Sequence, residues 1–202
     1  MSIENNPLVK PSPHKYGAVP FNEIKQEHFI PALEYAIKDA EKILDEVKNN
    51  TDAANFENTA LPMETCSELM GTIAHTYFNL MSAESDNDFK ELAQQISPKL
   101  SAFSNNIHLD SKLFEKVKHL YENMDTENLN AEQKRLVSES YKGFTLNGAL
   151  LNDEDKEKVR KIDEELSKLS PKFSQNTLNA TNEYTYYTEN KLDLSGIPEM
   201  VV

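Results

Sequence analysis

The stretch FIPALEYAIKDAEKILDEV at residues 29–47 decides the fold class. Its apolar side chains recur mostly at steps of three and four residues: Phe29, Leu33, Ala36, Ile37, Ala40, Ile43, Leu44 and Val47. That spacing places them on one face of an α-helix, whereas a half-buried strand would need strict alternation. Pro31 falls near the first turn, where a missing N–H costs little, and Asn49-Asn50-Thr51-Asp52 ends the helix. The stretch therefore predicts one long amphipathic helix.

Similar apolar stripes predict five further helices, at residues 56–82, 86–107, 110–121, 130–147 and 152–178. Pro98 should kink the helix at 86–107, and Pro171 should bend or end the last one. Only five glycines occur in the chain, far below the average share of about 7%, which favours long regular elements. Only Tyr184–Thr188 has the composition of a strand. We therefore expect an all-α fold.

The chain divides by composition into three parts. Residues 1–25 form an irregular arm because their prolines deny a helix its hydrogen bonds, and Phe21 and Ile24 are expected to anchor this arm on the core. Residues 26–190 form a helical domain of about six helices. Residues 191–202 carry LSGIPE at 194–199, which reads as a turn leading into a helix, yet the chain ends at Val202. This pattern predicts a piece of a longer protein.

Charge and hydropathy exclude several function classes. The 202 residues include 34 acidic and 21 basic side chains, for a net charge of −13. A protein that binds nucleic acid through its phosphates needs a basic stripe, and docking on anionic lipid needs basic residues too. The sequence contains no apolar run of about 18 residues that could span a membrane and no signal-peptide pattern. We therefore expect a cytoplasmic protein with neither nucleic acid nor a membrane as partner.

The histidines and the single cysteine do not form a recognisable reactive or metal-binding motif. None of the five histidines is followed by Glu, and no two lie four residues apart, so a helical pair of zinc ligands is absent: His14, His28, His75, His108 and His119. His28 and His75 are more simply interpreted as core residues. Cys66 lies among Leu61, Leu69 and Met70 and is interpreted as a buried structural thiol. No metal ligand is predicted in the chain.

The charged and aromatic clusters also have plain structural interpretations. The Asp153-Glu154-Asp155 and Glu164-Glu165 carboxylates could do acid–base chemistry only if burial raised one pKa, so they are interpreted as solvated charge. The cations of residues 156–161 are predicted to form a solvated face. Tyr184, Tyr186 and Tyr187 are predicted to pack on a neighbour outside the chain. No catalytic residue is predicted, and substrate-binding residues stay unassigned.

Several short strings occur in an order that resembles the thimet-type zinc oligopeptidases, in particular the bacterial peptidyl-dipeptidases and oligopeptidase A. They are PFNEIKQEHFIPA at 20–32, FENT at 56–59, LFEKV at 113–117, GALL at 148–151, FSQN at 173–176 and LSGIPE at 194–199. Each string is weak alone, but their order covers nearly the whole chain. The chain thus resembles the N-terminal region of that family.

This resemblance implies a two-lobed, all-helical metallopeptidase with a deep substrate channel, of which the chain is the N-terminal lobe. In the family, one zinc ion is held by an H-E-x-x-H helix and a downstream Glu, and the Glu of the motif activates water. Those residues belong to the C-terminal part, so no catalytic or zinc-binding residue carries over, and the 202-residue chain alone is predicted inactive. The implied partners are the C-terminal catalytic lobe and short peptides, to which the N-terminal helices limit access.

A second interpretation is a free-standing acidic helical interaction or scaffold domain without enzymatic activity. The two interpretations differ in what lies beyond Val202. As part of a larger enzyme, the chain alone would expose apolar surface and self-associate, with Met and Tyr residues at the contact.

Overall fold

The computed structural model describes residues 2–83 and 86–198, and every regular element in those ranges is helical. The α-helices are α1 (Phe29–Asn49), α2 (Leu61–Thr65), α3 (Glu68–Ala83), α4 (Asn87–Glu91), α5 (Ala93–His108), α6 (Ser111–Asn123), α7 (Ala131–Leu146) and α8 (Asp153–Glu183). Short 3-10 turns are η1 (Ile3–Asn5), η2 (Lys15–Gly17), η3 (Phe21–Glu23), η4 (Gln26–His28) and η6 (Lys191–Leu194), and η5 (Phe56–Ala60) is a π-helical turn. The predicted all-α fold is confirmed.

The six predicted helices correspond to α1, to α2 with α3, to α4 with α5, and to α6, α7 and α8. Pro98 lies inside α5, whose helix continues to His108, and Pro171 lies inside α8, which continues to Glu183. Pro171 therefore does not end the last helix. Residues 184–188 form no strand, so the strand-like composition of that segment was misleading. The helix start expected at 194–199 extends into residues outside the described ranges.

Side-chain caps fix where several helices begin. A helix leaves its first backbone N–H groups without partners, and an Asp or Asn just before it supplies an acceptor. Four such residues each accept a hydrogen bond from a first-turn N–H at 2.8–3.0 Å: Asp86, Asp110, Asn130 and Asn152. These are the positions at which the sequence predicted helix starts.

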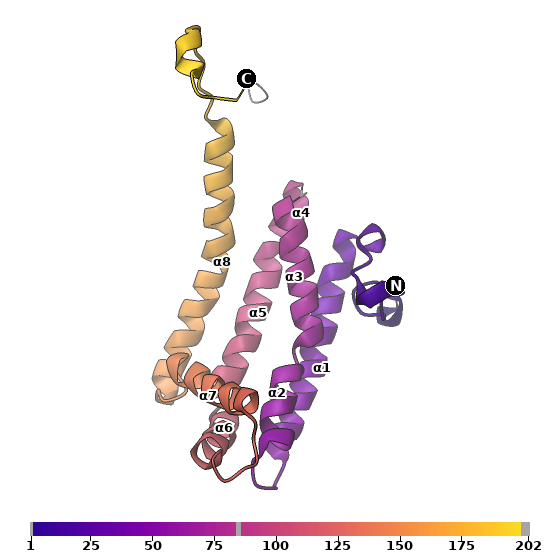
Figure 1. The fold of residues 1–202 in the computed structure, drawn as a ribbon, viewed down its shortest axis with the longest axis vertical. Coiled ribbons are helices and arrows are strands. Elements are labelled where there is room, and N and C mark those ends of the chain that lie inside the picture. Colours follow the sequence, from indigo (N-terminus) through magenta and orange to yellow (C-terminus); the bar gives the residue numbers. More distant parts are fainter. Residues whose placement is uncertain (1, 84–85, 199–202) are drawn as a thin grey trace.

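Figure 1 shows α1, α3 and α5 side by side along the long axis of the molecule, with α6 and α7 at one end. α8 starts at that end, runs beside α5, and continues past the other helices. Three clusters of buried apolar side chains hold the bundle together. The first is centred on Phe29 and Tyr77, the second on Leu113 and Phe144, and the third joins η5 to α6 and α7.

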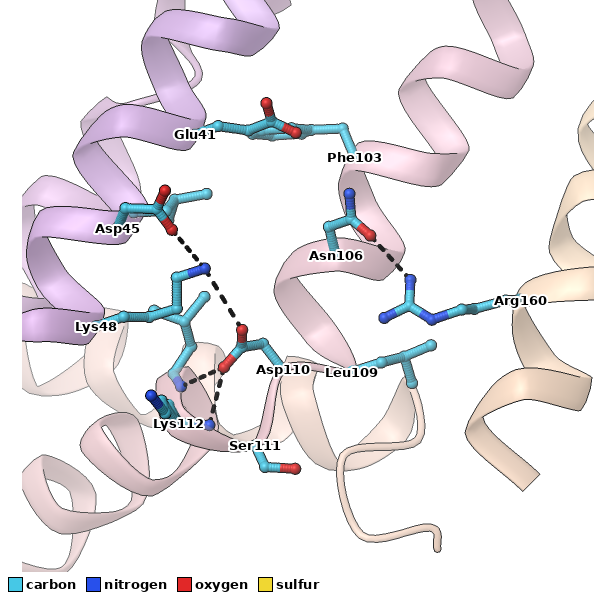
Figure 2. Close-up of a pocket in the computed structure, with 12 residues that line it drawn as sticks. Glu41, Asp45, Lys48, Phe103, Asn106, Leu109, Asp110, Ser111, Lys112 and Arg160 are labelled. Atoms are coloured by element: carbon cyan, nitrogen blue, oxygen red, sulfur yellow. Dashed lines mark hydrogen bonds and ion pairs between the residues drawn. The ribbon is translucent and has the colours of Figure 1, made fainter. Parts of the chain in front are cut away.

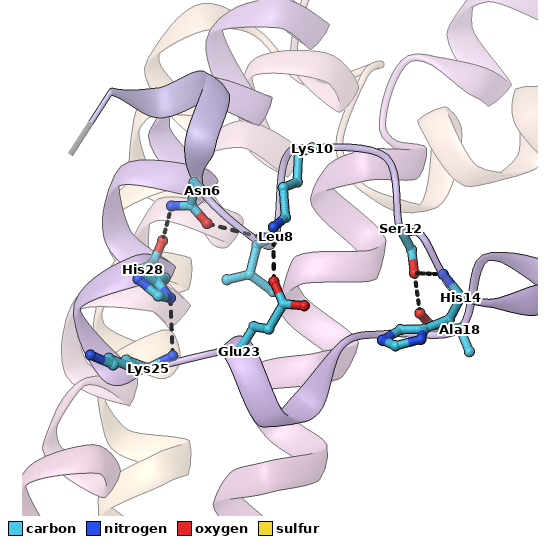
Figure 3. Close-up of polar contacts among 9 residues, drawn as sticks. All are labelled: Asn6, Leu8, Lys10, Ser12, His14, Ala18, Glu23, Lys25 and His28. Atoms are coloured by element: carbon cyan, nitrogen blue, oxygen red, sulfur yellow. Dashed lines mark hydrogen bonds and ion pairs between the residues drawn. The ribbon is translucent and has the colours of Figure 1, made fainter.

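The N-terminal arm is fastened to the start of α1 by Asn6 (Figure 3). Its side-chain nitrogen donates to the His28 carbonyl at 2.8 Å, and its oxygen accepts from the Leu8 N–H at 2.9 Å. Asn6 is itself buried, and Leu8 joins the first apolar cluster. These contacts satisfy buried polar groups, which would otherwise cost free energy.

The predicted anchors of the arm are half correct. Ile24 packs against the first cluster, but the Phe21 side chain is 50% exposed. Leu8 fills a buried place beside α1, and Phe21, in the turn η3, lies at the surface. The positions of the prolines in the arm did not indicate that Leu8, and not Phe21, would be buried.

Candidate functional site

Cys66 is a buried thiol, as the sequence indicated. Its Sγ donates to the Met63 carbonyl at 3.2 Å, and burial raises the pKa of the thiol to about 11. A nucleophilic cysteine needs the opposite change, a lowered pKa that yields thiolate at neutral pH. Cys66 therefore serves packing.

Of the two histidines interpreted as core residues, only His28 is buried. His28 is buried, and its Nδ1 accepts the Lys25 N–H at 3.0 Å, whereas its Nε2 has no hydrogen-bond partner there. The interpretation of His75 as a core residue was wrong, because its side chain is exposed between buried neighbours of α3. The apolar residues around it suggested burial, but the helix turns it outward.

The candidate acid–base carboxylates of α8 lie at the surface, fully or partly exposed. Glu164 accepts from the Lys168 ammonium group at 2.6 Å, and this hydrogen bond lowers the pKa of Glu164. A general acid needs a raised pKa. Glu164 is thus stabilised as an anion on the surface of α8, which agrees with the solvated charge predicted there.

Two members of the basic run at residues 156–161 contact neighbouring helices, and one of them is buried. The Lys156 side chain is only 6% exposed, and its ammonium group donates to the Ser111 hydroxyl at 3.0 Å. Arg160 lies one helical turn further, and its Nη1 donates to the Asn106 side-chain oxygen at 2.9 Å. Both residues turn towards α5 and α6, so the predicted solvated face was wrong for Lys156, whereas Arg160 stays 33% exposed.

Arg160 borders a pocket with a volume of about 590 Å³ (Figure 2). Ligand pockets in proteins usually measure about 300–1,000 Å³. One wall comes from α1, the opposite wall from α8, and the remaining lining from the end of α5 and the start of α6. Four buried apolar side chains form its base: Leu44, Phe103, Leu109 and Leu113.

Charged groups of both signs surround this base. Lys48 contacts Asp45 at 2.6 Å and Asp110 at 3.6 Å, and the hydrogen bond to Asp45 is the main reason that the pKa of Lys48 is raised. Asp110 also caps α6 through the Lys112 and Leu113 N–H groups. The pocket therefore has a polar wall around Lys48, which stays charged.

Sequence inspection missed this pocket because its residues come from four helices and form no local motif. A signal was present at the start of α8. Arg160 and Lys156 lie four residues apart and hence share one face of the helix. Only the packing of α8 on α5 and α6 brings that face to the residues of α1.

The apolar stripe of α8 faces away from the bundle. Each of its four large side chains is more than half exposed, and Phe173 reaches 73%: Ile162, Leu166, Leu169 and Phe173. We call these four residues the outer stripe of α8. The side of α8 towards α5 instead carries polar contacts, such as that of Arg160 with Asn106. A helix that turns its apolar side outward presents a surface for another partner.

Comparison with known proteins assigns the family. Residues 33–156, from α1 to the first turn of α8, match the family described as neurolysin/thimet oligopeptidase, N-terminal domain. The chain belongs to the neurolysin/thimet oligopeptidase family. Its all-helical architecture agrees with this assignment.

Several members of this family resemble the chain along most of its length. Dipeptidyl carboxypeptidase of Salmonella typhimurium is 30% identical over 179 residues, which are 89% of this chain and 26% of that protein. Its namesake in Escherichia coli is 26% identical over 98% of this chain, and Escherichia coli oligopeptidase A is 27% identical over 96%. The chain spans 26–29% of the length of these relatives.

The described residues do not fit a zinc site. No three side chains of His, Cys, Asp or Glu in the ranges 2–83 and 86–198 are grouped so that they could hold a metal ion. Zinc in proteins is held by three or four such ligands.

None of the described helices is both long and apolar enough to cross a membrane.

Proposed function

We propose that this chain is the non-catalytic N-terminal helical part of a zinc-dependent oligopeptidase of the peptidyl-dipeptidase type. In this proposal its helices wall the substrate channel and limit access to short peptides, and the zinc ligands lie outside these residues. Membership of the neurolysin/thimet oligopeptidase family supports the assignment, as do relatives that are named for peptidase activity. The proposed division is an arm at 1–25, a helical domain at 26–190 and a connection from 191.

The outer stripe of α8 is the observation that carries this proposal. Burying apolar surface contributes about 25 cal/mol per Å², so an exposed row of four large side chains is a strong attachment surface. The proposed occupant is the catalytic lobe of the same polypeptide. The described methionines that contact the core clusters are only partly exposed, whereas Tyr184, Tyr186 and Tyr187 are exposed. The attachment surface is thus built from Leu, Ile, Phe and Tyr side chains.

The proposal makes the isolated chain inactive and self-associating, and it places the parent enzyme in the cytoplasm. Sedimentation of the 202-residue chain should reveal reversible dimers, and replacing Leu169 and Phe173 by Asp should shift them to monomers. His119→Asp adds a charge at an exposed position of α6 and serves as the matched control. Strictly monomeric wild-type chain at high concentration would contradict the attachment surface.

Activity provides the second test. The full polypeptide should cleave short unstructured peptides in a chelator-sensitive manner, and the Leu169→Asp/Phe173→Asp variant should lose stability and activity together. The 202-residue chain should neither hydrolyse peptides nor retain stoichiometric zinc after dialysis. Zinc-dependent cleavage by the chain alone would refute the proposed non-catalytic role.

The alternative is a free-standing acidic helical domain that binds basic partners, favoured by the net charge of −13. The reading frame beyond Val202 separates the two proposals. A continuing frame with an H-E-x-x-H helix supports the oligopeptidase, and a stop codon supports the free-standing domain.

A further inference from the structure

The pocket between α1 and α8 combines features that suit one class of small molecule. We propose that it binds a short zwitterionic ligand, a free amino acid or dipeptide with an apolar side chain. Arg160 would hold the ligand carboxylate, Glu41 and Asp45 would hold its ammonium group, and the apolar base would receive its side chain. All residues that line the pocket come from the 202-residue chain, and the proposed binding does not depend on peptidase activity.

The charges of the pocket favour a ligand that carries both signs. Three carboxylates line it, from Glu41, Asp45 and Asp110, against three cations, from Lys48, Lys112 and Arg160. An anion alone would face the carboxylates, and a simple cation would face Lys48 and Arg160. The carboxylates do not converge into a metal-binding group in the described ranges. A zwitterion meets an opposite charge at both ends.

Arg160 is positioned to bind a carboxylate. The bond from its Nη1 to Asn106 and the 3.4 Å contact of its Nε with Glu157 orient the guanidinium group. Its Nη2 has no partner among the described residues, and Figure 2 shows the side chain pointing into the pocket from α8. A planar guanidinium group that is already oriented loses little entropy on binding a carboxylate.

The opposite wall supplies the anions. Glu41 and Asp45 lie four residues apart on α1, and hence on one face of that helix, where like charges repel. Lys48 binds Asp45 and leaves Glu41 without an ion-pair partner in the described part of the chain. An ammonium group at this wall would relieve the repulsion and pair Glu41.

Isothermal titration of the 202-residue chain with leucyl-leucine tests the proposal. We expect saturable binding with a Kd at or below about 1 mM. N-acetyl-leucine and leucinamide, which each lack one charge, should bind about tenfold more weakly or not at all, because a charge-assisted hydrogen bond is lost. Sodium acetate and ammonium chloride are the probes for each charge alone.

Two variants locate the site. Arg160→Gln and Glu41→Gln should each weaken leucyl-leucine binding about tenfold or more. Arg135→Gln on α7 and Glu115→Gln on α6 remove the same charges at exposed positions and should leave binding unchanged. Glu41 has no hydrogen-bond or ion-pair partner within residues 2–83 and 86–198, so its variant keeps the test valid even if Arg160→Gln unfolds, which circular dichroism would reveal.

Three results would overturn the proposal. They are the absence of saturable leucyl-leucine binding below about 10 mM, equal binding of leucyl-leucine and either singly charged analogue, and unchanged binding in the Glu41→Gln variant. Binding lost in both pocket variants and kept in both controls would support it.

Discussion

Replacing Phe29 by Ala should remove a large part of the stability of the fold. Phe29 is fully buried at the start of α1, and its ring meets Tyr77 and Phe89 edge-on at centroid distances of 5.4 and 5.5 Å. A Phe→Ala change in a core costs about 3–5 kcal/mol, and each aromatic pair contributes about 0.5–1.5 kcal/mol beyond its buried area. We therefore expect a loss of about 4 kcal/mol, out of a total that is typically about 5–15 kcal/mol.

Urea denaturation followed by circular dichroism measures this loss. In a chain of this size a loss of about 4 kcal/mol lowers the melting temperature by about 8–16 °C. Phe21→Ala is the matched control, because Phe21 lies eight residues earlier and is half exposed, and we expect it to cost less than about 1 kcal/mol. Equal losses for the two variants, or a loss below about 2 kcal/mol for Phe29→Ala, would refute the reasoning.

Three further predictions concern other parts of the bundle. Gly148 follows α7 with a φ of +97°, and an added Cβ would meet the Leu151 side chain at 3.0 Å. Gly148→Ala should therefore lower the free energy of unfolding by about 1–2 kcal/mol in urea titrations. An unchanged midpoint of urea unfolding would contradict this. Lys156→Met replaces a buried ammonium group that has no ion pair in the described ranges and should be neutral or stabilising, whereas a loss above about 2 kcal/mol would show that the charge is needed. Burial raises the pKa of Cys66 to about 11 and that of Tyr77 to about 12, from ordinary values of 9.0 and 10.0. The unfolded chain loses these protons first, so stability should be full below about pH 9 and fall as the pH rises to about 12, and Tyr77→Phe should flatten this decline in pH-dependent urea melts.

The helices and their starts were largely predictable because they depend on local chemistry. The apolar period of residues 29–47 identified α1, and Asp86 and Asp110 marked helix starts that the structure has. Breaks such as that between α4 and α5 at Leu92 were not predicted, since the apolar stripe continues across them. The spacing of apolar residues indicates which side of a helix is apolar. It does not reveal a local break in the backbone hydrogen bonds.

The candidate site was not predictable by the same means. The pocket joins Glu41 and Lys48 of α1 to Asp110 before α6 and Arg160 of α8, and these residues are far apart in the chain. In the sequence, these charged side chains could not be distinguished from ordinary surface residues. Only the packing of four helices brings them around one apolar base.

The sequence by itself determined the helical class, the acidic surface and the family to which the chain belongs. Those properties follow from local periodicity, composition and short ordered strings. The tertiary structure alone decided which apolar faces are covered. Residues of α1 and α8 carry similar stripes, yet that of α1 is buried and the outer stripe of α8 is exposed. The hydrophobic effect has no direction. An apolar stripe on a helix therefore indicates only that some partner should cover it. The arrangement of the other helices shows whether this chain supplies that partner.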